Sequence, residues 1–575
     1  MAASDLPTHP SAYLTGAAAD LLSTHWHHCS GLIVIGAIGA VTRLVAPLLG
    51  DKQRDPAVLV LDADGHLVIP LVGGHRAGAE SWAQALAAAL DGQAVITGDS
   101  ASSGRLALDA FGAAWGWRRS GSGSHWNALM FQRAQTHSSS IRQTAGSLLW
   151  RQAPGARQSC RDTDDLAEAD LSIGPERRSD NGCAWHPPCL WLGVGCERDT
   201  SMSLITRAIV RSLEASELAI DAVAGLSTID RKGDEPALLS LAEQRDWPLR
   251  LHSAEALAAV AVPNPSAVVE AEMGTASVAE AAALLAAGSE GRLLQAKSIE
   301  KPLGPEERGA ATVAIAAAPQ PHAPERGHLH LIGSGPGSLQ LLTPEAHLAL
   351  ARCPVWVGYG LYLDLLEPLR RCDQVRLDGQ LTRERERCAE ALQLAQQGIQ
   401  VALISSGDSG IYGMAGLALE LWLAQPAADR PAFSVHPGIS ALQLAAARAG
   451  APLMHDFCTI SLSDRLTPWP VIERRLEAAA AGDFVVALYN PRSKDRNWQL
   501  ERARELLLVE RQPSTPVLLA RQLGRPEEEI QHTSLGALDP NAVDMLTVVL
   551  IGNSSTYSMD GCMVTPRGYP GATLC

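Results

Sequence analysis

Two glycine-rich loops stand where a ligand site built from backbone groups is expected. Gly333, Gly335 and Gly337 follow the apolar segment HLHLIG, and the run SSGDSG at 405–410 follows the apolar segment VALI. Each apolar segment predicts a strand of a parallel sheet, and loops at the carboxyl ends of such strands offer free N–H and C=O groups to ligands. Both loops are therefore candidates for binding a small molecule.

The same residues also fit a purely structural role or a different ligand. Glycine lets a strand-to-helix turn bend and pack closely, and Asp408 has the right type for a helix cap. The GxGxG spacing with Pro336 inside differs from the GxGxxG of dinucleotide sites, and the segment CPVWVGYG ends in Gly358 and Tyr359 where an acid would bind a ribose. A nucleotide-dependent oxidoreductase is therefore an alternative.

The chain as a whole predicts a multidomain α/β protein. Its 575 residues exceed the size of a single core. The net charge of −15 opposes nucleic-acid binding, and no apolar run is long enough to span a membrane. Eleven cysteines without a CxxC pair indicate reduced thiols and predict no metal site, and the lack of a signal segment predicts a cytoplasmic protein.

The alternation of apolar segments and turns predicts five units. The first, residues 1–119, is an α/β domain with a strand GLIVIG, a hairpin at Asp64-Gly65, a helix at 81–90, a strand at 94–97 and a helix at 107–114. The less regular residues 120–188 predict a small intermediate domain or a poorly ordered bridge. Residues 189–317 return to α/β alternation, from the strand LWLGVG to a final strand ATVAIAA.

The Pro-rich residues 318–327 predict a linker, and 328–575 form the last unit. In that unit the segments HLHLIG, VWVGY, VALIS, FVVALYN, PVLLA and TVVLIG predict strands that alternate with helices, as in doubly wound α/β domains.

The order of motifs in the last unit resembles the tetrapyrrole methylase family. These motifs are IGSGPGSLQLLTPEA, VGYGLYLDLL, SSGDSGIYGMA, HPGISALQLAAARAGAPLMHDFCTISLSD, DFVVALYNPRSKDR and DMLTVVLIGNSST. Within that family, HDFCTISLSD and YNPRSKDR are similar to the branch of precorrin-3B or cobalt-factor III C-17 methyltransferases. The resemblance implies two α/β subdomains with S-adenosyl-L-methionine in the cleft between them, and methylation accompanied by contraction of the macrocycle. Cobalt would enter only inside the substrate.

The resemblance also implies roles for individual residues. The residues expected to line the methyl-donor site are Gly407, Asp408, Ile411, Tyr412, Gly438, Ser440, Ala441, Tyr489 and Asn490. Gly333 and Pro336 are expected to border the tetrapyrrole. Ser338 departs from the family pattern, which often has Asp after GPG. Transfer of a methyl group from a sulfonium chiefly needs positioning and exclusion of water.

Substrate carboxylates and the ring contraction call for further groups. Arg492, Lys494 and Arg496 beside the YNP turn are predicted to bind carboxylates. For Arg383, Arg385 and Arg387 a solvated charged face is the alternative that we favour. Asp464 is the predicted acid or base for the contraction, with His455 as a second candidate. Related methylases commonly dimerise, so a homodimer through this unit is expected.

Residues 30–317 resemble the cobalt-precorrin-5A hydrolase family. The similar segments are GAIGAVTRLVAPLLGDKQRDPAVLVLDADG, VIPLVGGHRAGAE, AVITGDSASSGRLALD, LWLGVGCERDTS, LSTIDRKGDEPALLSLA and MGTASVAEAAALL. That family opens a lactone and releases acetaldehyde, which needs an activated water and donors for an oxyanion. His75 and Glu80 of the GGHRAGAE turn are the predicted catalytic residues. The further candidates are Cys196, Lys232, Asp234, Glu235 and Glu280. A noncatalytic tetrapyrrole-binding module is the alternative for this half.

Overall fold

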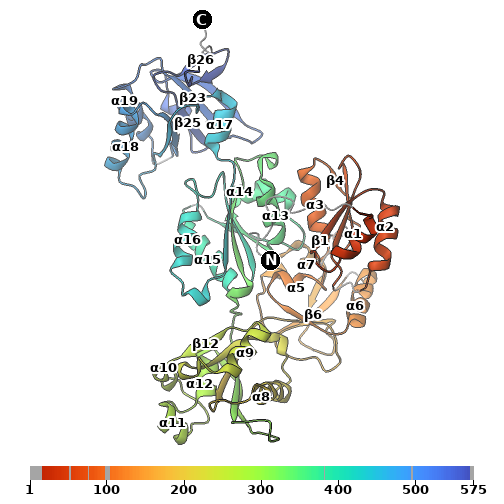
Figure 1. The fold of residues 1–575 in the computed structure, drawn as a ribbon. Helices are drawn as coiled ribbons and strands as arrows, with labels where there is room; N and C mark the ends of the chain where they lie inside the picture. Colours follow the sequence, from red (N-terminus) through yellow and green to blue (C-terminus); the bar gives the residue numbers. More distant parts are fainter. Residues whose placement is uncertain are drawn as a thin grey trace.

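The computed structural model describes residues 16–50, 54–74, 77–97, 104–136, 138–380, 382–493 and 496–569. Within these residues the strands form six sheets, and helices pack against the larger ones (Figure 1). The predicted α/β class is therefore confirmed.

The first sheet has the order β1-β2-β3-β4 and carries helices on both faces. Its elements are α1 (Ala18–His25), β1 (Gly31–Ile35), α2 (Ile38–Val45), β2 (Ala57–Leu61), β3 (Leu67–Val72), α3 (Ala79–Ala89) and β4 (Gln93–Ala94). The predicted hairpin is present, because β2 and β3 pair antiparallel across Gly65, whose φ is +72°. The strand predicted at 94–97 is wrong in extent, since only Gln93 and Ala94 pair with β3.

Residues 104–188 contain a folded sheet and not a disordered bridge. The order is β5-β9-β8-β6-β7, and the elements are α5 (Phe111–Ala114), β5 (Arg118–Ser120), α6 (Gly123–Thr136), β6 (Ser139–Gln143), α7 (Pro154–Arg157), β7 (Cys160–Asp162), β8 (Leu171–Ile173) and β9 (Ala184–His186). Its core is aromatic, with Phe111 within 5.9 Å of the rings of Trp117, Trp150 and Trp185. The helix predicted at 107–114 is only the short α5.

The third sheet has the order β12-β11-β10-β14-β13, with β10, β11 and β12 parallel. Its elements are β10 (Leu190–Cys196), α8 (Met202–Ala215), β11 (Val223–Ile229), α9 (Pro236–Arg245), β12 (Leu249–His252), α10 (Ala254–Ala258), α11 (Ala267–Met273), α12 (Val278–Ala287), β13 (Arg292–Glu300) and β14 (Ala311–Ala317). Helices α8 and α9 cover one face and α12 covers the other. The predicted final strand is β14, while β13 was not predicted.

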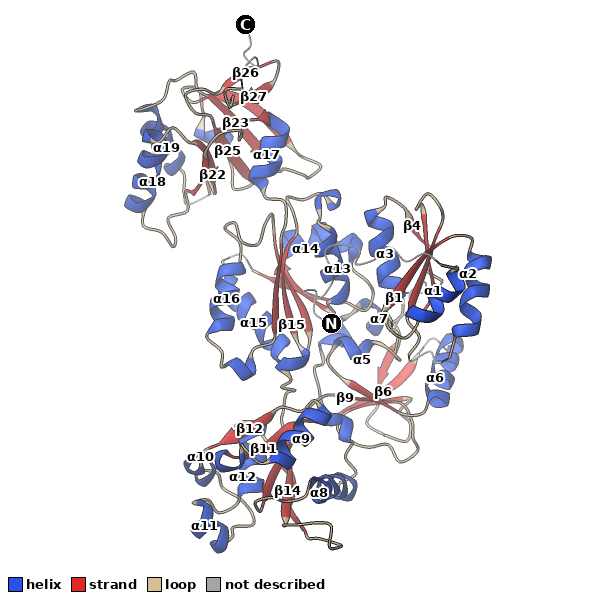
Figure 2. Ribbon diagram, in the orientation of Figure 1, coloured by secondary structure: helices blue, strands red, loops and turns tan. Residues whose placement is uncertain are grey.

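The fourth sheet is fully parallel, with the order β17-β16-β18-β15-β19. Its elements are β15 (His328–Gly333), α13 (Pro344–Arg352), β16 (Val355–Tyr359), α14 (Gly360–Leu366), β17 (Val375–Gly379), α15 (Glu384–Gln396), β18 (Gln400–Ser405), α16 (Ala415–Leu423) and β19 (Ala432–His436). Figure 2 shows α13 and α14 on one side of this sheet and α15 and α16 on the other. The strands predicted as HLHLIG, VWVGY and VALIS are confirmed.

The fifth sheet, β21-β22-β25-β23-β24, is mixed, and a three-stranded sheet β20-β27-β26 adjoins it. The elements are α17 (Ala441–Ala449), β20 (Gly450–Ala451), β21 (Phe457–Ser461), α18 (Trp469–Ala481), β22 (Val485–Tyr489), α19 (Gln499–Leu508), β23 (Pro516–Arg521), β24 (Glu529–Ser534), β25 (Thr547–Ile551), β26 (Tyr557–Met559) and β27 (Cys562–Val564). The strands predicted in FVVALYN, PVLLA and TVVLIG are confirmed. Because β25 pairs antiparallel with β22 and β23, a fully parallel doubly wound sheet is ruled out for this part.

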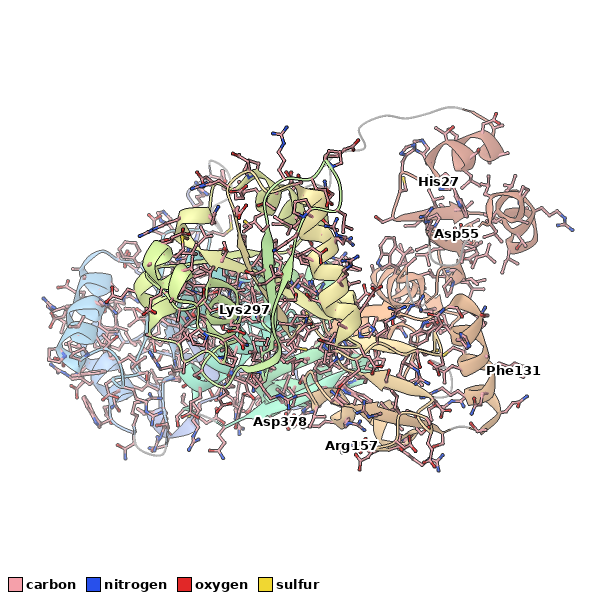
Figure 3. The ribbon with its side chains drawn as sticks, turned by 90° about the horizontal axis from the view of Figure 1, so that it is seen from below. His27, Asp55, Phe131, Arg157, Lys297 and Asp378 are labelled. Carbon is pink, nitrogen blue, oxygen red and sulfur yellow. The ribbon has the colours of Figure 1, made fainter. Side chains whose placement is uncertain are left out.

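The segment predicted as a linker, residues 318–327, packs against the fourth sheet's helices. Ala323 is buried and its N–H donates to the carbonyl of Gln396 at 2.9 Å. His322 and Arg250 both reach Asp429, at 3.0 and 3.4 Å. The third and fourth sheets are therefore joined by polar contacts, while the first sheet, with His27 and Asp55, lies apart from Lys297 of the third sheet (Figure 3).

Candidate active site

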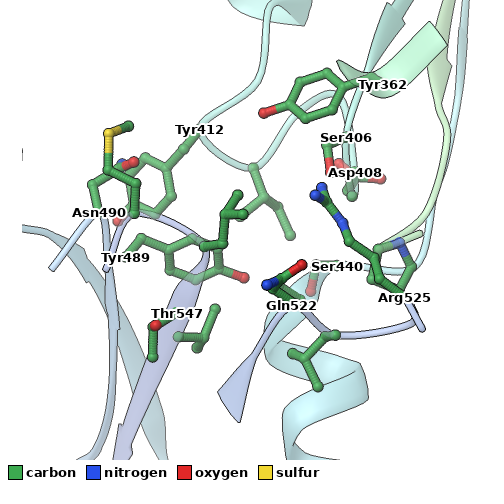
Figure 4. Close-up of a pocket in the computed structure, with 18 residues that line it drawn as sticks. Tyr362, Ser406, Asp408, Tyr412, Ser440, Tyr489, Asn490, Gln522, Arg525 and Thr547 are labelled. Atoms are coloured by element: carbon green, nitrogen blue, oxygen red, sulfur yellow. The ribbon is translucent and has the colours of Figure 1, made fainter. Parts of the chain in front are cut away.

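A cleft opens where the loops that follow β15, β18 and β19 meet the loops of the fifth sheet (Figure 4). Eight of the nine residues expected at the methyl-donor site line it directly: Gly407, Asp408, Ile411, Tyr412, Ser440, Ala441, Tyr489 and Asn490. Gly438 does not line it but supports it from behind. The structure thus brings together residues that are up to 83 positions apart in the chain.

Four glycines from three loops pack backbone to backbone at the base of the cleft. Gly335 and Gly407 exchange two hydrogen bonds, of 3.1 and 2.7 Å. A Cβ on Gly438 would lie 2.1 Å from the carbonyl oxygen of Gly407 and 2.7 Å from the carbonyl carbon of Gly333. Glycine is required here because the three loops approach one another more closely than any side chain allows.

Asp408 ties two of these loops together. Its carboxylate accepts hydrogen bonds from the N–H of Gly410 at 2.8 Å and from the N–H of Gly438 at 3.1 Å. The first bond belongs to a local turn, as the capping alternative supposed, and the second crosses to the loop after β19. Asp408 therefore both shapes the cleft and presents negative charge to it.

Aromatic side chains close the other side of the cleft. The rings of Tyr412 and Tyr489 lie 5.1 Å apart, and the Tyr412 hydroxyl donates to the carbonyl of Thr459 at 3.0 Å. The Tyr489 hydroxyl accepts from the N–H of Leu442, in the first turn of α17, at 3.0 Å. Burial raises the pKa of Tyr489, so its phenol stays protonated at neutral pH. Tyr412 is half exposed, which leaves ring surface for a ligand.

Comparisons with known proteins decide the family. The family model described as Tetrapyrrole (Corrin/Porphyrin) Methylases matches residues 328–539. A probable cobalt-factor III C(17)-methyltransferase of Salmonella typhimurium is 50% identical over 241 residues, which are 42% of this chain and 99% of that protein. The chain belongs to the tetrapyrrole methylases. This result excludes the dinucleotide-binding alternative for the glycine turn.

A second curated relative and a solved structure also match the methylase part. A precorrin-3B C(17)-methyltransferase of a Sinorhizobium species is 44% identical over 253 residues, which are 43% of this chain and 99% of that protein. The crystal structure of the methyltransferase CobJ is 40% identical, covers 42% of this chain and 100% of its own, and has a TM-score of 0.40.

The part before the methylase matches two further family models. Residues 20–101 match the one described as Cobalamin synthesis G N-terminal, and residues 190–316 match Cobalamin synthesis G C-terminus. The chain is therefore a fusion of cobalamin synthesis G domains with a tetrapyrrole methylase.

The methylase cleft also contains residues that sequence reasoning missed. They are Tyr362, Ser406, Gln522, Leu523, Arg525, Met545, Leu546, Thr547 and Val548. Asp408 and Arg525 are the charged residues among those that line the cleft. The Arg525 stem lies against the glycine turn, since its Cγ is 2.8 Å from the place of a Cβ on Gly337. Among the described residues, no carboxylate forms an ion pair with its guanidinium.

Arg492 and Arg496, two of the cations predicted from the YNPRSKDR segment, do not line the methylase cleft. Arg492 donates to the carbonyl of Pro540 at 2.6 Å and to the side chain of Asn541 at 2.8 Å. Arg496 is buried and donates to Ser463, and Lys494 lies outside the described residues. Arg492 is thus a correction: its guanidinium holds a neighbouring loop instead of facing the ligand cleft.

The two residues predicted to border the tetrapyrrole take different positions, and so do the arginines of residues 383–387. Pro336 lines the methylase cleft, whereas Gly333 lies beneath it in the glycine packing. Arg383 pairs with Glu386 on the exposed face of α15, and Arg387 is buried 3.7 Å from Glu384. The favoured interpretation as a charged face thus fits Arg383, while Arg387 belongs to the interior.

The acid–base candidates of the methylase also lie away from the cleft. Asp464 accepts a hydrogen bond from the Gln499 side chain at 3.0 Å, on the side of α19. His455 is half exposed, with its Nδ1 3.9 Å from Asp456. Neither residue lines the cleft, so the role of Asp464 in the ring contraction stays a prediction that this cleft does not support.

In the cobalamin synthesis G part, the predicted GGHRAGAE turn leads into α3. Its His75 lies outside the described residues, so its geometry is not described. Glu80 stands in the first turn of α3, with its N–H donating to the carbonyl of Gly74 at 3.1 Å. Its carboxylate folds back over Gly74, since Oε1 lies 3.1 Å from the place of a Cβ there.

The C-terminal cobalamin synthesis G domain holds the remaining candidates. Cys196 ends β10, and burial raises its thiol pKa to about 11. Glu280 is fully buried, and its carboxylate accepts from the Asn264 amide at 2.8 Å and from the N–H of Lys297 at 3.0 Å. The hydrogen-bonding capacity of the Glu280 carboxylate is therefore used by neighbouring groups of the same domain.

In the part of the chain that the structure describes, no group of three or more His, Cys, Asp and Glu side chains could hold a metal ion. No described helix is both long and apolar enough to cross a membrane.

Proposed function

We propose that residues 328–575 transfer a methyl group to C-17 of precorrin-3B or cobalt-factor III, with contraction of the macrocycle. One observation carries this proposal: the 50% identity to a C-17 methyltransferase of Salmonella over 99% of that relative's length. The cleft supports it, because eight residues expected at the methyl-donor site line one opening.

The methyl donor that fits this cleft is S-adenosyl-L-methionine, which supplies an electrophilic methyl group on a sulfonium. The close packing of Gly407 against Gly438 holds the loops after β18 and β19 together at the base of the cleft. Tyr412 and Tyr489 offer ring surface, and Asp408 offers a carboxylate to the donor's polar groups. These residues bind and orient the donor and exclude water, which is what an in-line displacement needs.

Replacing Asp408 by alanine in the full chain should weaken S-adenosylhomocysteine binding about 10- to 100-fold. The change removes the carboxylate offered to the donor, and it also removes the two hydrogen bonds by which Asp408 holds its loops. One charge-assisted hydrogen bond to the donor contributes about 1.5–3 kcal/mol, which corresponds to this loss of affinity. Isothermal titration measures the effect. Asp539→Ala is the matched control, because Asp539 also caps a local turn but lies outside the cleft. Unchanged affinity in the Asp408 variant would remove that residue from the donor site.

We also propose that residues 1–317 open the lactone of cobalt-precorrin-5A and release acetaldehyde. The two cobalamin synthesis G matches support this activity. The test measures acetaldehyde from cobalt-precorrin-5A with the full chain. No release would leave the noncatalytic tetrapyrrole-binding module as the better description of this half. His75→Ala and Glu80→Gln test the GGHRAGAE turn, and unchanged release would exclude it.

A homodimer through the methylase part remains part of the proposal, because the family resemblance implies it. Sedimentation velocity of the full chain tests it. A single species of one 60.8 kDa chain at micromolar concentration would contradict the dimer.

A further inference from the structure

The C-terminal cobalamin synthesis G domain contains a buried charge pair at the carboxyl edge of its parallel strands. Lys232 ends the short helical turn that follows β11, and Glu235 precedes α9. Their side chains are 9% and 1% exposed, and Lys232 Nζ lies 3.6 Å from Glu235 Oε2. We call Lys232 and Glu235 the buried pair. Loops at such an edge are where open α/β sheets bind ligands.

The buried pair is poorly satisfied by the protein. Neither carboxylate oxygen of Glu235 has a hydrogen-bond partner among the described residues, and Lys232 stands just beyond hydrogen-bond distance. Glu280 in the same domain shows the contrast, since its buried carboxylate accepts several hydrogen bonds. Burying two charges without such bonds costs several kcal/mol per ion, so the pair is not explained by stability.

The N-terminal end of α12 lies at the same edge. A Cβ on Gly195 would lie 3.6 Å from Val278, so the first turn of α12 stands on the end of β10. Thr275, two residues before the Ser277 cap of α12, has a buried hydroxyl without a hydrogen-bond partner in the described structure. Free donors near a helix N-terminus favour a developing negative charge.

A single exposed arginine covers the buried pair. Arg198 donates to Asp234 at 2.5 Å and to the carbonyl of Arg231 at 2.6 Å, and its guanidinium lies 3.8 Å from Glu235. Its side chain is 54% exposed, and exposed ion pairs contribute only about 0–1 kcal/mol. Displacing Arg198 therefore costs little free energy, and its displacement is the access route for a substrate that the inference below requires.

We propose that Lys232 and Glu235 form the ester-hydrolysing centre of this chain, a role that rests on the proposed lactone opening. Glu235 takes a proton from a water molecule whose oxygen bonds to the lactone carbonyl carbon. Lys232 stabilises the carbonyl oxygen as it becomes anionic. The ring C–O bond then breaks, and the proton on Glu235 passes to the leaving alkoxide. One water is consumed, and the product is a hydroxy acid. Acetaldehyde leaves in the following step, in which the freed hydroxyl loses its proton and becomes the aldehyde carbonyl, the C–C bond to the macrocycle breaks, and the macrocycle carbon takes up a proton.

Cys196 is excluded as the nucleophile of this centre. Burial holds its thiol pKa at about 11, so the reactive thiolate is scarce at neutral pH. Attack by water is therefore the step that the residues support.

The test replaces the buried pair by apolar residues of similar size, Lys232→Met with Glu235→Leu, in the full chain. Apolar replacement of a buried ion pair is often neutral or stabilising, so Tm should hold or rise. S-adenosylhomocysteine affinity should stay unchanged. Acetaldehyde release from cobalt-precorrin-5A should fall below a tenth of the wild-type rate. Arg177→Met with Glu214→Leu, which removes an exposed pair, should leave release unchanged.

The outcomes separate this centre from the rest of the proposal. If the wild-type chain releases no acetaldehyde, both the lactone-opening function and the proposed centre are wrong. Release by both the wild type and the buried-pair variant would overturn the centre alone. If the double variant fails to fold, Glu235→Gln keeps the side-chain shape and must by itself bring release below a tenth.

Discussion

Replacing Gly438 by alanine is expected to weaken S-adenosylhomocysteine binding by the full chain by up to about 100-fold. The new Cβ would stand 2.1 Å from the oxygen of Gly407 and 2.7 Å from the carbon of Gly333. Both neighbours are backbone atoms, so the overlap is relieved only by moving the loops that form the cleft floor. Overpacking of this kind typically costs about 1–3 kcal/mol, and here the loops that must move are the ones that bind the ligand.

The φ angle of Gly438 is not in the left-handed region, so the effect tests the close approach alone. Gly416→Ala is the control, because a Cβ there meets nothing within 4 Å and Gly416 lies in α16. Alanine in a helix is favoured over glycine by about 1 kcal/mol, so the control should bind normally and not lose stability. Normal affinity in the Gly438 variant would show that the donor does not depend on this floor.

Buried apolar strands were the most predictable feature of the fold. β15, β18, β22 and β25 are short apolar runs bounded by glycine or polar turns, and each lies where its sequence predicts. The sheet of residues 118–186 was not predictable in this way. Its strands have three to five residues, and its core depends on tryptophan rings such as Trp150 and Trp185, which leave no hydrophobic period.

Residues of the candidate site were predictable only where they belong to a recognisable sequence motif. The loop around Asp408 and the turn of Tyr489 and Asn490 follow strands directly, and both line the cleft. Gln522 and Arg525 lie in a charged turn after β23 that carries no recognisable pattern. Only the packing of the two methylase subdomains brings this turn to the glycine loop, where a Cβ on Gly524 would lie 3.0 Å from Ser338 N.

Arg492 was predicted to bind substrate but does not line the cleft. A cation beside the YNP turn satisfied the chemistry of carboxylate binding, but sequence does not show where a guanidinium points. In the folded chain its donors are used by Pro540 and Asn541. A segment that contains a cation in the sequence therefore need not offer that cation to a ligand. Whether it does depends on which cations the fold leaves unpaired.

Arg525→Gln is expected to raise KM for the tetrapyrrole about 10- to 100-fold and to leave S-adenosylhomocysteine affinity unchanged. Arg525 lines the cleft beside Pro336 and Tyr362, and no described carboxylate neutralises it. A charge-assisted hydrogen bond to a substrate carboxylate contributes about 1.5–3 kcal/mol, which corresponds to this change in KM. Steady-state kinetics with precorrin-3B or cobalt-factor III measure it, and Arg525→Lys should recover part of the loss because the charge is kept.

Arg521→Gln is the matched control, four residues away on the same segment. Arg521 is already paired with Asp544 at 2.8 Å and Glu529 at 3.5 Å, and it does not line the cleft. Removing a guanidinium that carboxylates neutralise should leave KM within about twofold, since exposed pairs contribute little. An equal rise of KM in the two variants would mean that tetrapyrrole binding depends only on the overall charge of this turn. A rise confined to Arg525→Gln would mean that one unpaired cation, supplied by the C-terminal subdomain, recognises the substrate.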